Sequence, residues 1–205
     1  MKTLIDKFID YQIENRLISD EERDTYKYAY IILVEEVLNI LIATIIGVYF
    51  ELFFLVLIFL LSYIPLRRYA GGFHAENGGS CCGISGLIIF LICLWFQIMN
   101  MPIICFVESS ILPIAHFVIF VFAPIDSSNK RLSELEREEY RWKTWIVLSI
   151  QILVLVMSWV FEDIRLFYGI GSAHIVLSGM ILTGIYKDKR IKNRDIFAHN
   201  NKNGF

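Results

Sequence analysis

The 205-residue sequence has no internal repeat, no low-complexity tract and no long linker, so it predicts a single domain. No small-residue cleavage site follows an apolar core near the N-terminus, so we expect no signal peptide. The four cysteines form no disulfide framework, and only one histidine lies close to any of them, so we expect no metal and no cofactor. The net charge is only −2, and acidic residues are interleaved with the basic ones. Nucleic acid is therefore not an expected partner.

Apolar residues are abundant instead. They make up 56% of the chain, aromatic residues make up 15%, and the mean hydropathy is +0.56, which is typical of a protein embedded in a lipid bilayer. A membrane-spanning helix needs roughly 20 apolar residues, and the second and fifth candidate segments are short for this. We predict an all-α polytopic membrane protein with spans at about residues 29–50, 51–66, 82–101, 102–123, 145–161 and 166–186.

Positive charge is unevenly distributed over the connections between these spans. All of the 19 Lys and Arg residues except Arg165 lie on alternating connections. Because cytoplasmic loops are enriched in Lys and Arg, this pattern predicts a cell-membrane protein with both termini in the cytoplasm, including a basic tail over residues 187–205. The connection after the second span would also be cytoplasmic.

Two segments outside the spans carry helix signals. Residues 3–18 place apolar side chains on one helical face and charged ones on the other, so residues 1–25 predict an amphipathic helix at the cytoplasmic membrane surface. Packing of this helix against the cytoplasmic loops is the alternative. Ser133-x-x-Glu136 has the form of a capping box and predicts a helix that runs into the fifth span.

His74 and Cys81 lie seven positions apart in the Gly-rich loop between the second and third spans. An imidazole can take a proton from a nearby thiol, and a thiol at the start of a helix is favoured as the thiolate. A cysteine-nucleophile site is therefore one hypothesis. The alternatives for Cys81 and Cys82 are palmitoylation, metal binding and a purely structural role. Cys93 and Cys105 lie within spans and are interpreted as packing residues.

Other polar residues lie inside the predicted spans. Glu35 and Glu36 are about 100° apart on the first helix, so at most one of them can face a given site, where it would orient His74. Glu108 and two histidines, His116 and His174, would mark a polar pathway or be buried polar groups with hydrogen-bond partners.

Two motifs resemble the accessory gene regulator B (AgrB) family of Gram-positive bacteria, and the resemblance covers nearly the whole chain. The first is the set Arg67, Gly72, His74 and Cys81 after the second span, and the second is Ala123-Pro124-Ile125-Asp126-x-x-Asn129-Lys130 after the fourth. A second thiol, Cys82, departs from the family's pattern, and the family spacing selects Cys81. The resemblance implies that the family's catalytic histidine and cysteine correspond to His74 and Cys81. It also implies that the family's characteristic arginine and glycine correspond to Arg67 and Gly72.

The resemblance implies a membrane-embedded cysteine endopeptidase that cleaves the C-terminal tail from an AgrD-like precursor of an autoinducing quorum-sensing peptide. Cys81 would hold the precursor as a thioester, and a precursor thiol would then close a cyclic thiolactone. A homodimer is also implied. Backbone N–H groups at Ser80–Cys82 would form an oxyanion hole. The groups expected to bind an acidic precursor tail lie on the same cytoplasmic loops, and they are Arg67, Arg68, Lys130 and Arg131, with Asp126 beside them.

Two other classes of function remain open from the residues. One is a small transporter that exports a peptide or an amphiphile, with Glu108, His116 and His174 along its path. The other is a structural or regulatory membrane partner without activity. A neighbouring small reading frame that encodes an amphipathic leader, a central cysteine and an acidic tail is expected only for the processing enzyme.

Overall fold

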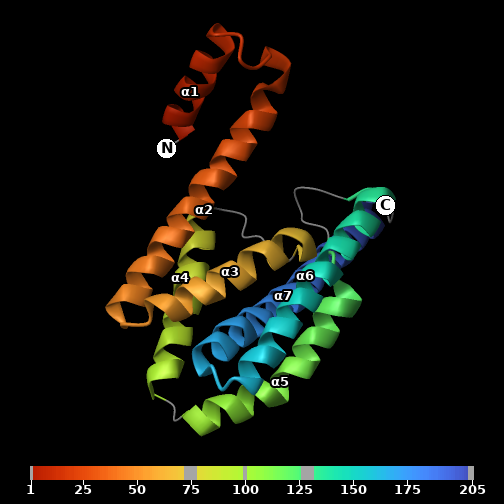
Figure 1. Ribbon diagram of the computed structural model, residues 1–205. Helices are drawn as coiled ribbons and strands as arrows, with labels where there is room; N and C mark the ends of the chain where they lie inside the picture. Colours follow the sequence, from red (N-terminus) through yellow and green to blue (C-terminus); the bar gives the residue numbers. More distant parts are fainter. Residues whose placement is uncertain (1, 72–77, 99–100, 126–131, 203–205) are drawn as a thin grey trace.

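A computed structural model describes residues 2–71, 78–98, 101–125 and 132–202, and these residues form a bundle of α-helices (Figure 1). The predicted all-α fold is confirmed, because the regular elements of this part of the chain are helices. In chain order they are α1 (Lys2–Glu14), the short 3-10 turn η1 (Asp20–Glu22), α2 (Arg23–Tyr49), α3 (Phe53–Ala70), α4 (Gly78–Ile98), α5 (Met101–Phe122), α6 (Glu134–Val160) and α7 (Ile164–Lys202).

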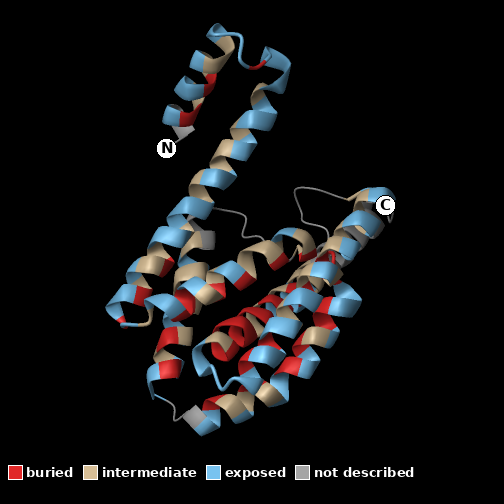
Figure 2. Cartoon of the chain, in the orientation of Figure 1, coloured by how far each residue is buried: buried red, intermediate tan, exposed pale blue. Residues whose placement is uncertain are grey.

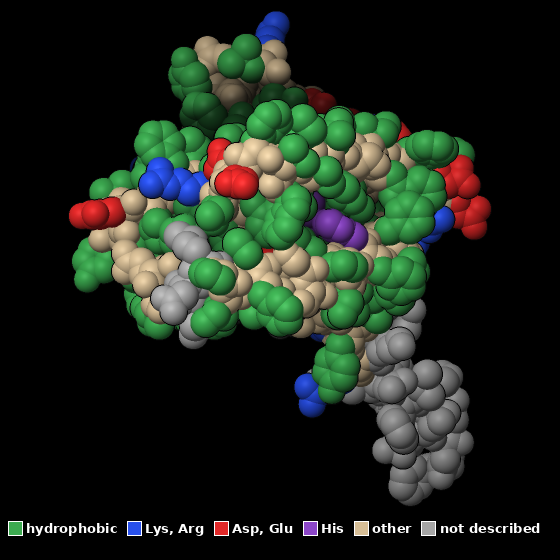
Figure 3. Space-filling model, turned by 60° about the horizontal axis from the view of Figure 1, so that its bottom comes forward, with side chains coloured by type: hydrophobic (Ala, Val, Ile, Leu, Met, Phe, Trp, Pro, Cys, Tyr) green, Lys and Arg blue, Asp and Glu red, His purple; other side chains and the backbone are tan. Residues whose placement is uncertain are grey.

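Five helices, α2, α3, α5, α6 and α7, are long and apolar enough to cross a membrane, and the apolar part of α4, Cys82–Ile98, is shorter. Figure 3 shows one face of the molecule covered by hydrophobic side chains, with most charged side chains towards its margins. A soluble monomer rarely exposes so large an apolar surface. The chain is therefore a multi-pass membrane protein.

The helix at the centre of the bundle is α7 (Figure 2). Its most apolar window is 56% buried, against 11% for that of α2. Small residues of α7 allow neighbouring helices to approach closely. A Cβ atom at Gly169 would lie 2.6 Å from Cγ2 of Ile58 on α3, so α3 and α7 pack against each other at this glycine.

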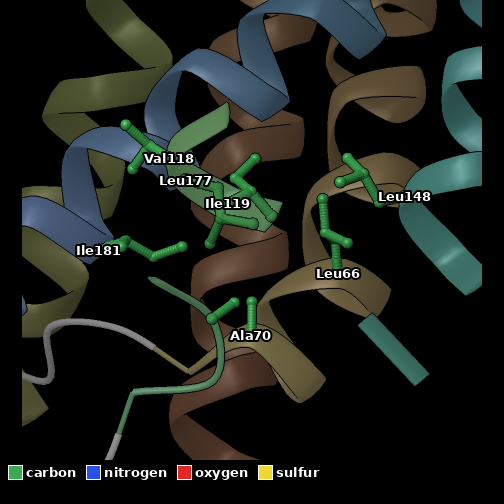
Figure 4. Close-up of a cluster of buried hydrophobic side chains, with 8 residues drawn as sticks. Leu66, Ala70, Val118, Ile119, Leu148, Leu177 and Ile181 are labelled. Carbon is green, nitrogen blue, oxygen red and sulfur yellow. The ribbon is translucent and has the colours of Figure 1, made fainter. Parts of the chain in front are cut away.

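A hydrophobic cluster holds α3, α5, α6 and α7 together near the point where α3 ends (Figure 4). Its buried members are Leu66, Ala70, Val118, Ile119, Ala123, Leu148, Leu177 and Ile181. We refer to the end of the bundle defined by Ala70, Gly78 and Phe122 as the loop end. The cluster gives the last two turns of α3 a packed position at this end.

The amphipathic helix α1 folds back on the start of α2. Ile5 and Ile9 are buried in this contact, whereas Leu4 and Phe8 remain exposed. The polar contacts of the pair are the hydrogen bonds between Gln12 and Tyr30 and the ion pairs Arg23–Asp10 and Lys27–Asp6. Part of the apolar face of α1 thus packs against α2, and the rest of this face is exposed.

The predicted start of α6 is confirmed. The Glu136 N–H donates to Ser133 Oγ at 3.3 Å, and the Ser133 N–H donates to Glu136 Oε2 at 3.0 Å, which are the two bonds of a capping box. The last helix is longer than its predicted span, because α7 continues through the basic tail to Lys202.

Candidate functional site

The ends of α3 and α5 meet at the loop end of the bundle. The N–H of Ile125 donates to the carbonyl of Ala70 at 3.0 Å, and Gly71 forms a single parallel bridge with Ile125. Gly71 has a φ of 71° and a ψ of −148°, a backbone conformation that is essentially restricted to glycine. A Cβ at this position would also lie 2.4 Å from the Ile125 carbonyl oxygen. Glycine is therefore required for this close approach.

This bridge places the starts of two predicted site segments side by side. One segment follows Gly71 and contains Gly72 and His74. The other follows Ile125 and contains the predicted substrate-binding residues Asp126, Lys130 and Arg131. These five residues lie outside the described residues, so the structure gives their points of departure only. Segments 54 positions apart in the sequence thus leave the bundle from adjacent residues.

Cys81 belongs to the first turn of α4, which begins at Gly78. The apolar run predicted a later start, close to residue 82, so the helix extends further into the Gly-rich loop than its hydropathy indicates. The first backbone N–H groups of a helix have no partner within the helix, and they favour a thiolate in its first turn. The side chains of Ser80 and Cys81 are outside the described part of the chain.

Arg67 of the first motif and its neighbour Arg68 lie in the last turn of α3 and have different surroundings. Arg67 donates from Nη1 to the Tyr63 hydroxyl at 2.6 Å, and its Cζ lies 5.5 Å from the centre of the Tyr63 ring. That ring in turn stacks on Phe59. Arg68 is exposed. Arg67 is therefore held against its own helix, and Arg68 is the more accessible cation of the pair.

Glu35 and Glu36 precede the part of α2 that packs against α4. The two helices run side by side in the same direction (Figure 1): a Cβ at Gly86 would lie 3.2 Å from Ile42 Cγ2, and further along the rings of Phe50 and Phe90 are 5.3 Å apart. Glu35 is about 10 Å before Ile42 along its helix, and Cys81 is about 7 Å before Gly86. Glu35 and Cys81 are thus at similar positions along the axes of α2 and α4.

Burial separates the two acidic neighbours. Glu35 is half-buried, whereas Glu36 is exposed. Of the two residues predicted as alternatives for the same role, Glu35 therefore has the surroundings that a residue directed towards the protein requires. No group of three or more His, Cys, Asp or Glu side chains that could hold a metal ion lies within the part of the chain that the structure describes.

The polar residues predicted within the spans form two separate groups. His116 Nε2 lies 2.9 Å from His174 Nδ1, and His174 Nε2 lies 2.8 Å from Oε1 of Gln151. Glu108 accepts a hydrogen bond from Ser172 Oγ at 2.8 Å. Gln151 and Ser172 were not predicted, because neither side chain is ionisable, although an amide in an apolar run is a comparable signal. Figure 3 shows histidine among the hydrophobic side chains of one face.

These features define a multi-pass helical membrane protein in which the residues preceding two loop segments, Gly71 and Ile125, lie side by side at one end of the bundle. The sequence matches the family model described as accessory gene regulator B over residues 5–185. The chain belongs to this family, as the two sequence motifs predicted. Membership assigns it to the processing of a quorum-sensing peptide.

Two relatives from Clostridium perfringens are similar over most of their length. An AgrB-like protein of strain SM101 / Type A is 31% identical over 176 residues, which is 82% of this chain and 79% of the relative. AgrB-like protein 2 of strain 13 / Type A is 30% identical over 163 residues, which is 75% of each chain. No solved structure matches the chain.

Proposed function

We propose that this protein is a membrane-embedded cysteine endopeptidase of a Gram-positive bacterium. It cleaves the C-terminal tail from an AgrD-like precursor and converts the remainder into a cyclic quorum-sensing peptide. Cys81 is the nucleophile and His74 is the general base. The loop end of the bundle faces the cytoplasm, where the precursor is made.

The bridge between Gly71 and Ile125 is the observation that carries this proposal. It gives the segment with His74 and the segment with Lys130 and Arg131 a common origin. The first turn of α4, which contains Cys81, belongs to the same end of the bundle. A nucleophile, a base and cations for an acidic tail are the groups that the reaction requires in one place.

The chemistry proceeds in two acyl transfers. His74 takes the proton from the Cys81 thiol, and the thiolate attacks a backbone carbonyl of the precursor. The C–N bond breaks, the released amine takes a proton from His74, and the precursor stays bound as a thioester. A thiol of the precursor then displaces Cys81 and closes the thiolactone ring.

Water competes with the ring-closing thiol for the thioester. A site at the membrane surface restricts water, and a thiol on the same acyl chain has a high effective concentration. The first transfer is uphill, because an amide bond is exchanged for a thioester. Removal of the released tail must therefore draw the reaction forward.

Substitution of the cysteines tests the proposal, with Cys82 as the matched control. Cys81→Ala and His74→Ala are expected to abolish cleavage of a co-expressed precursor and to leave membrane insertion unchanged. Cys82→Ala, which removes the neighbouring thiol, is expected to keep most of the activity. Cleavage is measured by mass spectrometry of the released tail and the cyclic product. Full processing by Cys81→Ala would refute the assignment of the nucleophile.

A further inference from the structure

Three hydrogen bonds in series connect four helices inside the bundle. His116 of α5 contacts His174 of α7, and His174 contacts Gln151 of α6, at 2.9 Å and 2.8 Å. Gln151 Nε2 then donates to the backbone carbonyl of Ser62 on α3 at 2.9 Å. The proposed reaction uses none of these side chains, so their arrangement needs a separate explanation.

The direction of each bond follows from the carbonyl at Ser62. This oxygen can only accept, so Gln151 directs its NH₂ group towards α3 and its Oε1 towards α7. That oxygen accepts from an N–H on His174 Nε2. A neutral His174 then accepts at Nδ1, and His116 donates to it from Nε2. His174 is completely buried, so each group of the series has its orientation set by the next one.

The series ends on α3 in the turn before Pro65, one residue after the carbonyl that this proline leaves without its helical donor. Pro65 has no N–H and its ring crowds the carbonyl of Leu61, so the helix cannot make its usual bond at this turn. The Ser62 hydroxyl also bonds back to the carbonyl of Ile58 at 2.9 Å, a contact that bends helices. Gln151 therefore supplies a donor from another helix at the turn where α3 determines its own direction least.

The part of α3 after Pro65 leads directly to the candidate site. Leu66 and Ala70 pack in the hydrophobic cluster of Figure 4, and Gly71 follows with its bridge to Ile125, which comes shortly after the end of α5. Gly71 is nine residues beyond Ser62, which is about 13 Å of helix, so a rotation of roughly 5° at Ser62 would move it by about 1 Å. A displacement of about this size at a reacting group can lower a rate on the order of a hundredfold.

We propose that Gln151 and His174 are positioning residues of the processing site. They set the direction of the last two turns of α3, and with it the point from which the segment containing His74 departs. His116 orients the ring of His174. This inference rests on the proposed function, because it assigns a role in the reaction at that same site.

The competing explanation is that the series only stabilises the bundle. The chain provides a matched control for this in Gln97 of α4. Its Nε2 donates to the carbonyl of Phe50 at 2.8 Å, a bond of the same kind and of nearly the same length as the one from Gln151. It joins α4 to the carbonyl at the end of α2 and not to the α3 turn that holds Ser62, so its loss should affect stability without changing the direction of the last turns of α3.

The first measurement compares Gln151→Leu with Gln97→Leu in liposomes, using a synthetic precursor. For Gln151→Leu we expect kcat to fall by about tenfold or more with KM within about twofold of the original value, because the precursor still binds but the loop is displaced. Gln97→Leu is expected to retain kcat within about twofold. An unchanged kcat in Gln151→Leu, or equal losses in the two variants, would overturn the proposal.

The second measurement does not depend on the reaction. Spin labels at Arg68→Cys on α3 and Arg141→Cys on α6, in a variant without the four native cysteines, report the position of the last turn of α3. We expect Gln151→Leu to shift or broaden this distance and Gln97→Leu to leave it unchanged. If Gln151→Leu does not fold, His116→Phe, which removes only the outer bond, is expected to give a smaller change of the same kind. An unchanged distance in the folded variant contradicts the proposal.

The two measurements test the proposed function and the positioning role of Gln151 separately. If the unsubstituted protein processes no precursor while the spin-label distance shifts in Gln151→Leu, the proposed function is wrong and the control of α3 by Gln151 stands. If the unsubstituted protein is active and the distance and kcat of Gln151→Leu are unchanged, the processing function stands and the positioning role is wrong.

Discussion

Glu35 and Glu36 are adjacent in the sequence, but only Glu35 is half-buried. It lies about two turns before Ile42, which contacts Gly86 of α4. We propose that the Glu35 carboxylate accepts an N–H from the ring of His74 and stabilises the imidazolium that forms when His74 takes a proton. The exposed carboxylate of Glu36 has no comparable surroundings, and it therefore serves as the control.

Glu35→Gln is expected to lower kcat for precursor cleavage by about tenfold or more, because an amide stabilises an imidazolium less well than a carboxylate does. Glu36→Gln makes the same chemical change at the exposed position and is expected to retain kcat within about twofold. The measurement is the cleavage rate at saturating precursor in liposomes. Equal rates for the two variants would remove Glu35 from the site.

The sequence identified Glu108, His116 and His174 as candidates for buried, hydrogen-bonded polar groups, but it did not predict which residues meet. His116 and His174 are 58 positions apart and Glu108 and Ser172 are 64 positions apart. These contacts arise from the packing of α5 against α7. At Gly171 a Cβ would lie 2.9 Å from Glu108 Oε2, so the glycine leaves room for the carboxyl group. A polar residue in an apolar run signals a role for itself but says nothing about its partner.

Apolar runs predicted the order of the helices, and local signals decided how well their ends could be predicted. The start of α6 was predictable because Ser133 and Glu136 form a capping box within four residues. The start of α4 and the end of α7 were not. The first residues of α4 are glycines, which give no apolar signal. The last turns of α7 form a charged tail rich in Lys and Arg, which are good helix formers but are not apolar.

The junction of α3 with α5 depends on Gly71. Gly71→Ala is expected to break the bridge to Ile125, because the backbone conformation costs roughly 1–3 kcal/mol for other residues and the added Cβ would overlap the Ile125 carbonyl. Since both site segments leave from this bridge, precursor processing should fall by about tenfold or more. Quantitative mass spectrometry of the products, with membrane insertion checked in parallel, measures the effect.

Gly179→Ala is the control for this substitution. Gly179 lies within α7, and a Cβ at this position would meet nothing within 4 Å. Alanine is the better helix former, so the variant should process the precursor normally and be at least as stable to heat. Normal processing by Gly71→Ala as well would mean that the bridge does not contribute to the site.

At the scale of the whole molecule, hydropathy could not distinguish the central helix from the peripheral one. The most apolar window of α2 is more hydrophobic than that of α7, yet it is far less buried. In a bilayer an apolar residue is equally well accommodated by lipid and by another helix, whereas close packing of helices requires small residues. The central position of α7 follows from its glycines, alanines and serines. These small residues, and not the apolar content of the helix, are the sequence signal for this position.

Orientation in the membrane is the property on which the proposed mechanism depends most, because a precursor made in the cytoplasm must reach the loop end of the bundle. The basic residues predict that this end is cytoplasmic. Leu135 lies at the same end, near the start of α6, and is 81% exposed. Glu51 and Glu162 are exposed in the turns at the opposite end. Single cysteines at these positions, in a background without the native cysteines, therefore report the two sides independently.

With a membrane-impermeant thiol reagent on intact cells, Glu51→Cys and Glu162→Cys are expected to react, and Leu135→Cys is expected to react only after the cells are made permeable. The two outer positions control for access of the reagent, and permeabilised cells control for the reactivity of the inner one. Labelling of Leu135→Cys in intact cells, with protection of Glu51→Cys, would place the candidate site outside the cell. All but one of the 19 Lys and Arg residues would then lie outside the cell, whereas the orientation rule places such residues on the cytoplasmic side. A precursor made in the cytoplasm could not reach His74 and Cys81 before crossing the membrane.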